Sequence, residues 1–499
     1  MRRLAPIALA LLAGCSLAPK LEQPELDVPA HYKALGADEP RGTWKAAEPA
    51  DALPRGEWWK VFNDSKLDEL EAQAMAANQT LKIAAARLAQ SRAVVGVVKS
   101  ELYPRFDAGF GPSRLKESGV SRGLPQGTDI PAFTVWRGQI TAAWEVDLFG
   151  RISDSVAAAR SDADAVAALY GATMLAVQAD VAQAYFALRQ ADDELRLLRA
   201  TVTSREESQR LVQRRFDAGE ISELDLAQAK TEVGLAQSQV YALERQRTQI
   251  ENGLAVLLGK APASFTLAPA PLVEALPSIP AGLPSSLLER RPDVAAASRI
   301  MAASNARIGV AKSAFFPVLR ITGLFGYESN DLSELFQWSS RTWALGPLFG
   351  TILTMPIFDG GRNQANLDRS YAVLEESVGA YRQTVLGAFA EVENNLVALR
   401  TLAGEADSTR DSVQSAARAL QIAESRYRAG AASYLQVVDG QRTLLVVQRL
   451  DVQIRGARAV STVALIRALG GGWADEAKQA GAQNDPTASA PAAARIPTQ

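Results

Sequence analysis

The feature that most constrains this chain of 499 residues is a pattern that occurs twice, in the same order, about 211 residues apart. Four motifs carry it, and their two copies lie at 96–100 and 309–313, 149–151 and 358–362, 215–219 and 426–430, and 258–259 and 469–470. The offset is 213 residues for the first motif and 211 for the others. A nearly constant register predicts a tandem duplication in which both halves are built from the same elements.

Proline-rich stretches separate the two predicted repeats from the rest of the chain. We expect the first repeat at 57–260 and the second at 285–473, each in the order helix, two strands, long helix, turn and helix. Residues 261–284 hold six prolines and predict a linker, while residues 15–56, also with six, predict an extended lead-in. Residues 474–499 are rich in Ala, Pro and Gln and predict a disordered tail.

The N-terminus combines two arginines, a short apolar run and the ending Leu-Ala-Gly-Cys at Cys15. The run is too short for a permanent transmembrane helix, so residues 1–14 predict a secretory signal peptide. Small residues before a cysteine resemble the bacterial lipobox, and we expect Cys15 to carry lipid such as palmitate. Ser16 follows, which by resemblance to known lipoproteins favours the outer membrane. A plain signal peptide with an incidental cysteine is the alternative.

The composition excludes several kinds of site. The formal net charge is −2, so that no nucleic acid or other polyanion partner is implied. Cys15 is the only cysteine and His31 the only histidine, which leaves no intrachain disulfide, no metal site and no catalytic dyad. We therefore expect neither an enzyme nor a cofactor. No stretch after the signal approaches 18 uncharged apolar residues, and no transmembrane helix is expected.

Two proline-free stretches, 151–218 and 362–429, predict helices that are each about 100 Å long. Both carry a coiled-coil seam with alternating steps of four and three residues. The first seam is Val177, Val181, Ala184, Leu188, Ala191, Leu195, Leu198 and Val202, and the second is Leu374, Val378, Tyr381, Val385, Ala388, Val392, Asn395, Leu399 and Leu402. An ordinary long coiled coil is an alternative that the seams alone do not exclude.

Residues 134–148 alternate between an apolar and a mostly polar face, which predicts a strand between lipid and water. We expect Trp136, Ile140 and Trp144 to face lipid, and Arg137, Gln139 and Thr141 to face a lumen. Similar patterns predict four strands in all, at about 105–117, 133–148, 318–329 and 342–358. A soluble β-domain with one wet face is the alternative.

Four strands cannot close a barrel. Strand edges cannot remain unpaired in lipid, because their backbone groups find no water there. Several chains must then share one barrel. Two copies would give about eight strands around a filled interior, whereas three would give about twelve and room for a lumen.

Further motifs resemble the outer-membrane efflux channels of the TolC/OprM type, in their NodT-like lipoprotein branch. The resemblance covers residues 15 to about 473 and is carried by 58–64 with Leu67 and Asn78, 144–151, 290–293, 309–317 and 356–362. It implies a mixed α and β membrane protein: a trimer with a shared 12-stranded barrel and a periplasmic α-helical tunnel. It also implies an antibiotic-resistance role, in which the channel exports small molecules for an inner-membrane RND-type pump through a periplasmic adaptor protein.

The same resemblance places a closed aperture at the two helical turns. Phe216, Gly219, Arg426 and Gly430 lie at the hairpin tips that meet the adaptor in the family. Tyr427 matches the family's gate tyrosine, and Asp225 and Asp439 match acidic positions near its constriction. The chain differs from some members at Ala432, which replaces a gate arginine, and at Gln436, which replaces a second aspartate. Ordinary packing and a solvated helix face are the alternative for Tyr427, Asp225 and Asp439.

Three other functions remain as alternatives. A lipoprotein enzyme would need a reactive constellation, which the sequence does not contain. A structural coiled coil or adhesin explains the helices but not the alternating strands in both halves. An outer-membrane conduit for type I protein secretion is the alternative within the family, and neighbouring genes would distinguish it from drug efflux. The sequence identifies neither the exported substrate nor the particular pump and adaptor.

Overall fold

A computed structural model describes residues 16–22, 24–26, 32–33, 56–273, 276–277, 290–346 and 352–471. The predicted signal peptide 1–14, Cys15, His31 and the predicted tail 474–499 lie outside these residues. The chain divides into two compact units. The sheet unit comprises Met1–Leu26, Ala86–Ala167 and Ala296–Gln383, and the hairpin unit comprises Asp27–Ala85, Ala168–Ala295 and Thr384–Gln499.

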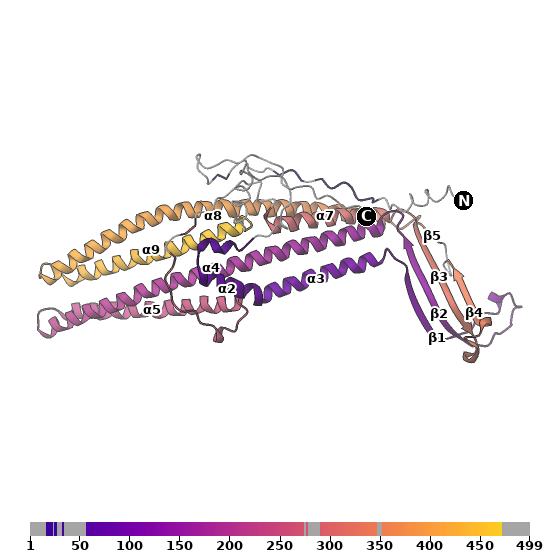
Figure 1. Ribbon diagram of the computed structural model, residues 1–499, viewed down its shortest axis with the longest axis horizontal. Coiled ribbons are helices and arrows are strands. Elements are labelled where there is room, and N and C mark those ends of the chain that lie inside the picture. The colour runs from indigo at the N-terminus through magenta and orange to yellow at the C-terminus, as the bar shows by residue number, and fades with distance from the viewer. Residues whose placement is uncertain are drawn as a thin grey trace, which may run out of the picture. The chain divides into compact units, whose positions relative to one another are not determined.

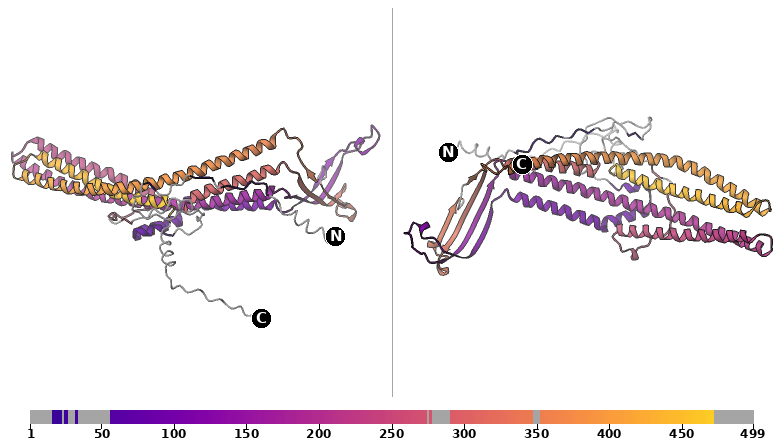
Figure 2. Two further views of the ribbon diagram at one scale, coloured as in Figure 1. Left: turned by 90° about the horizontal axis from the view of Figure 1, so that it is seen from above. Right: turned by 180° about the vertical axis from the view of Figure 1, so that it is seen from behind.

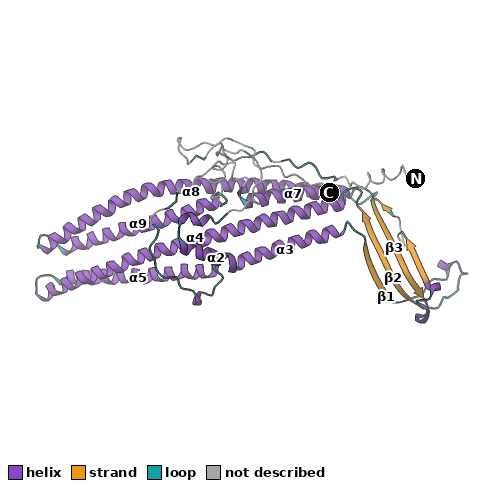
Figure 3. Ribbon diagram, viewed as in Figure 1, coloured by secondary structure: helices purple, strands orange, loops and turns teal. Residues whose placement is uncertain are grey.

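The sheet unit is built on antiparallel strands (Figures 1 and 3). These are β1 (Arg105–Leu115), β2 (Phe133–Val146), β3 (Val318–Ser329), β4 (Arg341–Leu345) and β5 (Leu353–Thr354), in the order β1-β2-β3-β4, with β5 also paired to β3. The predicted positions of the first three strands are confirmed.

The fourth predicted strand, 342–358, is wrong as one continuous element. β4 ends at Leu345 and β5 holds only Leu353 and Thr354, while residues 347–351 lie outside the described part of the chain. Pro347 lies in this interval, and proline has no N–H to donate to a strand ladder.

The strand register brings the predicted apolar faces together. Directly paired residues of antiparallel strands point to the same face of a sheet. Ile140 is paired with Ala108 on β1 and Phe325 on β3, and Trp144 is paired with Ile321. The opposite face is polar: Arg137 lies across from Glu328 with an N···O distance of 2.9 Å. The sheet therefore has one apolar and one polar face, as the alternation of residues 134–148 predicts.

The helices come in pairs of equal length. α3 (Gln79–Ser100) and α7 (Pro292–Ser313) each have 22 residues, α4 (Arg151–Asp217) and α8 (Arg362–Arg428) have 67, and α5 (Glu223–Leu257) and α9 (Tyr434–Ala468) have 35. The bounds of α7 lie 213 residues beyond those of α3, and the bounds of α8 and α9 lie 211 residues beyond those of α4 and α5. A shorter helix, α2 (Ser65–Ala77), has no counterpart among the described residues.

Two antiparallel helical hairpins, α4/α5 and α8/α9, extend through the hairpin unit (Figure 2). Both α4 and α8 end in the same hydrogen-bonded cap. At the first tip, the N–H of Gly219 donates to the carbonyl of Phe216, and that of Glu220 donates to Arg215. Gly430 and Ala431 repeat these bonds to Tyr427 and Arg426. Gly219 and Gly430 both have φ of +74°, the left-handed conformation that glycine adopts readily at the end of a helix.

The coiled-coil seam of α4 is the core of the hairpin unit. Val181, Leu188 and Leu198 are fully buried, and Leu195 packs in a cluster with residues of α5 and with Leu445 of α9. The seam of α8 is less covered: Val385, Ala388 and Val392 are buried, but its remaining predicted positions are only half-buried.

One 18-residue window within α4 is apolar and long enough to cross a membrane by composition alone. From the sequence, no such window is expected. However, 44% of it is buried inside the structure, and core helices of water-soluble proteins also meet this criterion. We therefore assign this window to the packed helical core.

Candidate gate at the hairpin tips

The two hairpin tips share one apolar cluster in the hairpin unit. It contains Val212 of α4, Leu226 and Ala229 of α5, and Tyr427, Tyr434, Val437 and Val438 from the α8/α9 hairpin. Phe216, which the sequence analysis placed at a tip, packs against the edge of this cluster. The hairpins are thus joined near their tips by apolar packing.

Tyr427 is a packed residue in this structure and is only 8% exposed. Its ring centroid lies 5.5 Å from that of Tyr434, and the guanidinium carbon of Arg215 lies 5.0 Å from the Tyr427 centroid. Its hydroxyl oxygen is buried without a hydrogen-bond partner in the described structure. Burial, followed by the influence of neighbouring Tyr427 and Glu232, raises the pKa of Tyr434 to about 12. Tyr434 is therefore neutral at physiological pH.

The two candidate acids have different surroundings. Asp225, in the first turn of α5, is half-buried, and its Oδ2 accepts a hydrogen bond of 3.2 Å from the Ser222 hydroxyl. Asp439, on α9, is exposed and lies 4.0 Å from Arg442. The charge of Asp225 is among the smaller causes of the raised pKa of Tyr434. No contact in the described chain joins Asp439 to Tyr427 or Asp225.

A buried acid that the sequence analysis missed connects the two hairpins. Glu232 of α5 is 2% exposed, and its carboxylate receives Arg205 of α4 at 3.0 Å. Arg442 of α9 also donates to it, from Nε at 3.0 Å and from Nη2 at 2.5 Å. Burial lowers the pKa of Arg205, while the Glu232 charge opposes this change. The burial of Glu232 could have been inferred from the sequence, because this acid interrupts an apolar stripe of α5 at helical spacing.

Further arginines of α9 continue this connection along α4. Arg449 approaches Glu194 to 2.6 Å, and Arg455 approaches Asp193 to 3.6 Å. Both acids are almost fully buried, whereas both arginines are about one-third exposed. Across the contact between the hairpins in the described structure, buried acids of the first hairpin therefore pair with arginines of the second.

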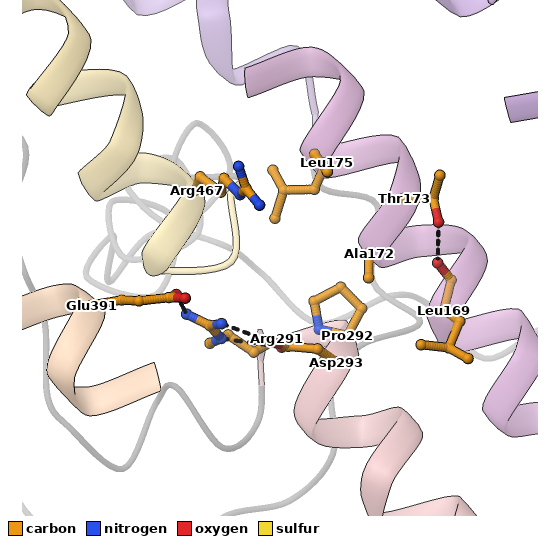
Figure 4. Close-up of a pocket in the computed structure, with 10 residues that line it drawn as sticks. Leu169, Ala172, Thr173, Leu175, Arg291, Pro292, Asp293, Glu391 and Arg467 are labelled. Carbon is orange, nitrogen blue, oxygen red and sulfur yellow. Dashed lines mark hydrogen bonds and ion pairs between the residues drawn. The ribbon is translucent and has the colours of Figure 1, made fainter. Parts of the chain in front are cut away.

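A cavity of about 330 Å³ lies elsewhere in the hairpin unit (Figure 4). Arg291 lies at its wall, donates to both oxygens of Asp293, and contacts Glu391 at 2.6 Å and the carbonyl of Ala468 at 3.0 Å. These contacts give residues 290–293 a structural role, because Arg291 joins the start of α7 to α8 and α9. Its donors are engaged by the protein itself.

The candidate lipid-facing residues lie on the apolar face of the sheet. Ile140 is 52% exposed, and the indole N–H of Trp144 donates to the carbonyl of Leu102 at 3.1 Å. Trp136 stacks at a tilt near Phe110, with ring centroids 6.3 Å apart. The described residues contain no group of three or more His, Cys, Asp or Glu side chains that could hold a metal ion.

The family model of outer membrane efflux proteins matches this chain at residues 70–260 and again at residues 283–471. The chain belongs to this family. The outer membrane efflux protein family is a family of outer-membrane transport components and not of enzymes. The resemblance stated from the sequence is therefore confirmed.

Relatives of the chain resemble it over nearly its whole length. The probable efflux pump outer membrane protein TtgC of Pseudomonas putida is 34% identical over 478 residues, which cover 95% of this chain and 96% of TtgC. The outer membrane protein OprJ of Pseudomonas aeruginosa is 34% identical over 464 residues, covering 93% and 94%.

Solved structures give the same result. The CmeC outer membrane channel of Campylobacter jejuni matches with a TM-score of 0.83 at 27% identity, covering 94% of this chain and 98% of that one. A membrane protein from Pseudomonas aeruginosa matches with a TM-score of 0.82 at 33% identity, covering 92% and 98%. The chain therefore has the fold of an outer-membrane efflux channel, with mixed helix and sheet, and its location is the outer membrane.

Proposed function

We propose that this chain is the outer-membrane channel of a tripartite efflux pump, which exports drugs or other small toxic molecules from the periplasm and the inner-membrane pump to the exterior. The match of the family model to both halves of the chain carries this proposal. Relatives that are 34% identical are named for antibiotic efflux and for toluene efflux. The partners would be a periplasmic adaptor protein and an RND-type inner-membrane pump. No enzyme activity and no cofactor is needed for passive conduction.

The channel would be a homotrimer with a shared 12-stranded barrel. In the described residues β1 pairs only with β2, and β4 pairs only with β3, so that both sides of the sheet end in open strand edges. An open edge is incompatible with lipid. Neighbouring copies would pair these edges, and three copies leave a lumen. The half-buried seam of α8 supports the same assembly, since a helix from another chain could cover it.

Each chain would be a tandem repeat with the domain boundaries predicted from its sequence. The double family match and the constant offsets between paired helices support this interpretation. Lipid on Cys15 would anchor the lead-in 15–56 at the outer membrane, with the helical hairpins in the periplasm. The apolar sheet face with Trp136, Ile140 and Trp144 would contact lipid.

The hairpin tips would form the closed periplasmic aperture and contact the adaptor through Phe216, Gly219, Arg426 and Gly430. Asp225 and Asp439 would give a trimer about six carboxylates near one opening, and rings of like charge favour cations. Replacing both with Asn should weaken cation preference in planar bilayers. Tyr427→Ala should raise the closed-state conductance, whereas Tyr427→Phe should not, because the hydroxyl has no partner in the described structure. Unchanged conductance in all variants would place the gate elsewhere.

Dye accumulation in cells tests the proposed function. The host would express the cognate adaptor and pump but lack its own channel. Expression of this chain should then lower the intracellular dye several-fold. Gln139→Arg should retain this effect, and Ile140→Arg should lose it because the charge lies on the proposed lipid face. Unchanged dye accumulation, with the wild-type chain present in the outer membrane at normal level, would contradict the proposal.

A further inference from the structure

The residues that directly follow Cys15 are held against the sheet unit by a buried acid. The hydroxyl of Ser16 donates to Oδ1 of Asp154 at 2.6 Å, although the two residues are 138 positions apart in the sequence. Asp154 lies in the first turn of α4 and is only 3% exposed. The backbone N–H groups of Leu17 and Ala18 also favour the charged form of this carboxylate, and that of Ala18 donates to the Ser16 hydroxyl at 3.2 Å. A buried carboxylate needs such donors, and this one receives them from the N-terminal segment.

Two residues of α7 complete the contact. The side-chain amide of Asn305 donates to the carbonyl of Pro19 at 2.7 Å. Gly309 lies where the segment crosses α7: a Cβ atom there would be 2.0 Å from Oδ2 of Asp154 and 2.8 Å from the backbone nitrogen of Ala18. Only glycine leaves space for both groups.

The repeated sequence motif provides an internal comparison for Gly309. Its counterpart in the first half is Gly96, and a Cβ atom at Gly96 would meet nothing within 4 Å. Helix propensity alone disfavours glycine at both positions. The close approach of the N-terminal segment therefore gives Gly309 a steric requirement that Gly96 does not have.

We propose that Asp154, Asn305 and Gly309 form a docking site for the first residues of the mature chain, and that this site fixes the position of the lipid anchor on the sheet unit. The inference rests on the proposed lipidation of Cys15. Cys15 directly precedes Ser16, and consecutive Cα atoms are about 3.8 Å apart, so a docked Ser16 restricts the acylated residue to its immediate surroundings. An undocked lead-in would instead leave the anchor on an extended tether of many residues.

One atom of the site indicates a further donor. Oδ2 of Asp154 is buried and has no hydrogen-bond partner in the described structure. The backbone N–H groups that remain at this end of the mature chain are those of Ser16 and Cys15, and the latter would be an acylated amide in a mature lipoprotein. The docking site would thus recognise the N-terminal backbone and Ser16, and the acyl chains would remain free to enter the membrane.

Tryptic cleavage after Lys20 tests the docking in the full-length, detergent-solubilised protein. Cleavage requires local release of the segment, so its rate reports the population of the undocked form. Trypsin should cleave Asp154→Ala and Gly309→Ala about tenfold faster than wild type. The first variant loses a charge-assisted hydrogen bond, and the second loses the steric fit of the segment. Ser16→Ala removes only one contact and leaves α4 itself unchanged. Its tryptic cleavage should therefore be accelerated less.

Matched variants separate docking from general loosening of the sheet unit. Gly96→Ala changes the equivalent glycine of the other repeat. Asp162→Asn removes an acid of the same helix that pairs with Arg307 of α7 but does not contact the segment. Both should cleave at the wild-type rate. Equal rates for wild type, Asp154→Ala, Gly309→Ala and Ser16→Ala would overturn the docking site, as would equal acceleration by Gly96→Ala and Asp162→Asn.

Fatty-acid labelling distinguishes failure of docking from failure of lipidation. If wild type is labelled and Cys15→Ser is not, Cys15 is lipidated. If the docking variants are then cleaved at the wild-type rate, the anchor is supported and the docking site is rejected. Label absent from wild type would reject the anchor and, with it, the role of the site in positioning lipid.

Discussion

The hairpins α4/α5 and α8/α9 have the same lengths and the same seam, but their surroundings differ. Leu188 of α4 is fully buried, whereas its counterpart 211 residues later, Leu399 of α8, is only half-buried. Val181 and its counterpart Val392 are both fully buried. A duplicated periodicity therefore predicts a helix and the face through which it packs. It does not predict whether the packing partner comes from the same chain. The first seam is satisfied within the chain, whereas part of the second is left for a neighbouring copy that the proposed trimer would supply.

The charges of the two hairpins differ in a complementary way. Glu232, Glu194 and Asp193 of the first hairpin are buried. Arg442, Arg449 and Arg455 of the second reach them while remaining partly exposed. A buried acid cannot lose its partner without a large cost, whereas a partly exposed arginine can exchange its partner for water. The first hairpin is therefore the fixed part of the pair, and we expect the largest mutational effects there.

Glu232→Ala should produce the largest loss of stability. It leaves the buried guanidinium of Arg205 without its acid, which costs about 3–5 kcal/mol. Glu244→Ala is the matched control, because it removes an exposed acid of the same helix from its 2.7 Å pair with Arg199 and should cost at most about 1 kcal/mol. Thermal unfolding followed by circular dichroism would measure both. Equal effects would show that burial does not distinguish the two ion pairs.

Leu188→Ala and Leu399→Ala test the seam comparison directly. The first should cost about 2–5 kcal/mol, because a fully buried side chain leaves a cavity. The second should cost clearly less in helix stability but should weaken association between chains. Thermal unfolding and native mass in detergent would be measured for both variants. A larger loss of helix stability for Leu399→Ala would reverse the comparison.

In the sheet, by contrast, the two halves should be equivalent. Ile140 of the first half and Phe325 of the second are directly paired and share the apolar face. Replacing either with Arg should cost about 2–4 kcal/mol if the face lies near the bilayer midplane. Gln139→Arg, on the opposite face, is the control and should assemble normally. The amount of heat-resistant assembly in outer-membrane fractions would be measured for each variant. A wild-type amount for Ile140→Arg would indicate that this face of the sheet is exposed to water.

The smallest effect, per pH unit, should be a pH dependence that originates in the first half. Glu71 of α2 is fully buried, and both of its carboxylate oxygens lack hydrogen-bond partners in the described structure. Burial, with a smaller effect of Asp68, raises the pKa of Glu71 to about 9 from its usual 4.5. The folded state therefore holds a proton that the unfolded state releases between these values. The stability contributed by Glu71 is complete below about pH 4.5 and is lost as pH rises towards 9.

Glu71→Gln should remove this dependence. Relative to the variant, the wild-type protein should lose up to about 1.4 kcal/mol of stability per pH unit between pH 5 and 8. Glu69→Gln is the control, because Glu69 is exposed and its interaction with Lys66 lowers its pKa instead. Unfolding temperatures across this range would show the slope. Parallel curves for wild type and Glu71→Gln would mean that Glu71 has an ordinary pKa.

Local patterns in the sequence predicted most of the fold. Period-two alternation located β2, and the motif around Gly219 located a helix end, because both depend only on nearby residues. The fourth strand alternates poorly and contains Pro347, and the expectation of one continuous element at 342–358 was wrong. The contacts of Glu232 and Asp154 could not be predicted, because they join residues 210 and 138 positions apart. Tyr427 was located at a tip, but its burial depends on packing between the two hairpins.

The mass of the detergent-solubilised protein tests the central claim, that one chain is an incomplete part of a shared channel. Light scattering corrected for bound detergent would measure it on the full-length wild type. We predict three chains per particle, because the open edges of the sheet and the half-buried seam of α8 both require neighbouring copies. A stable, folded monomer with its sheet intact would contradict this account.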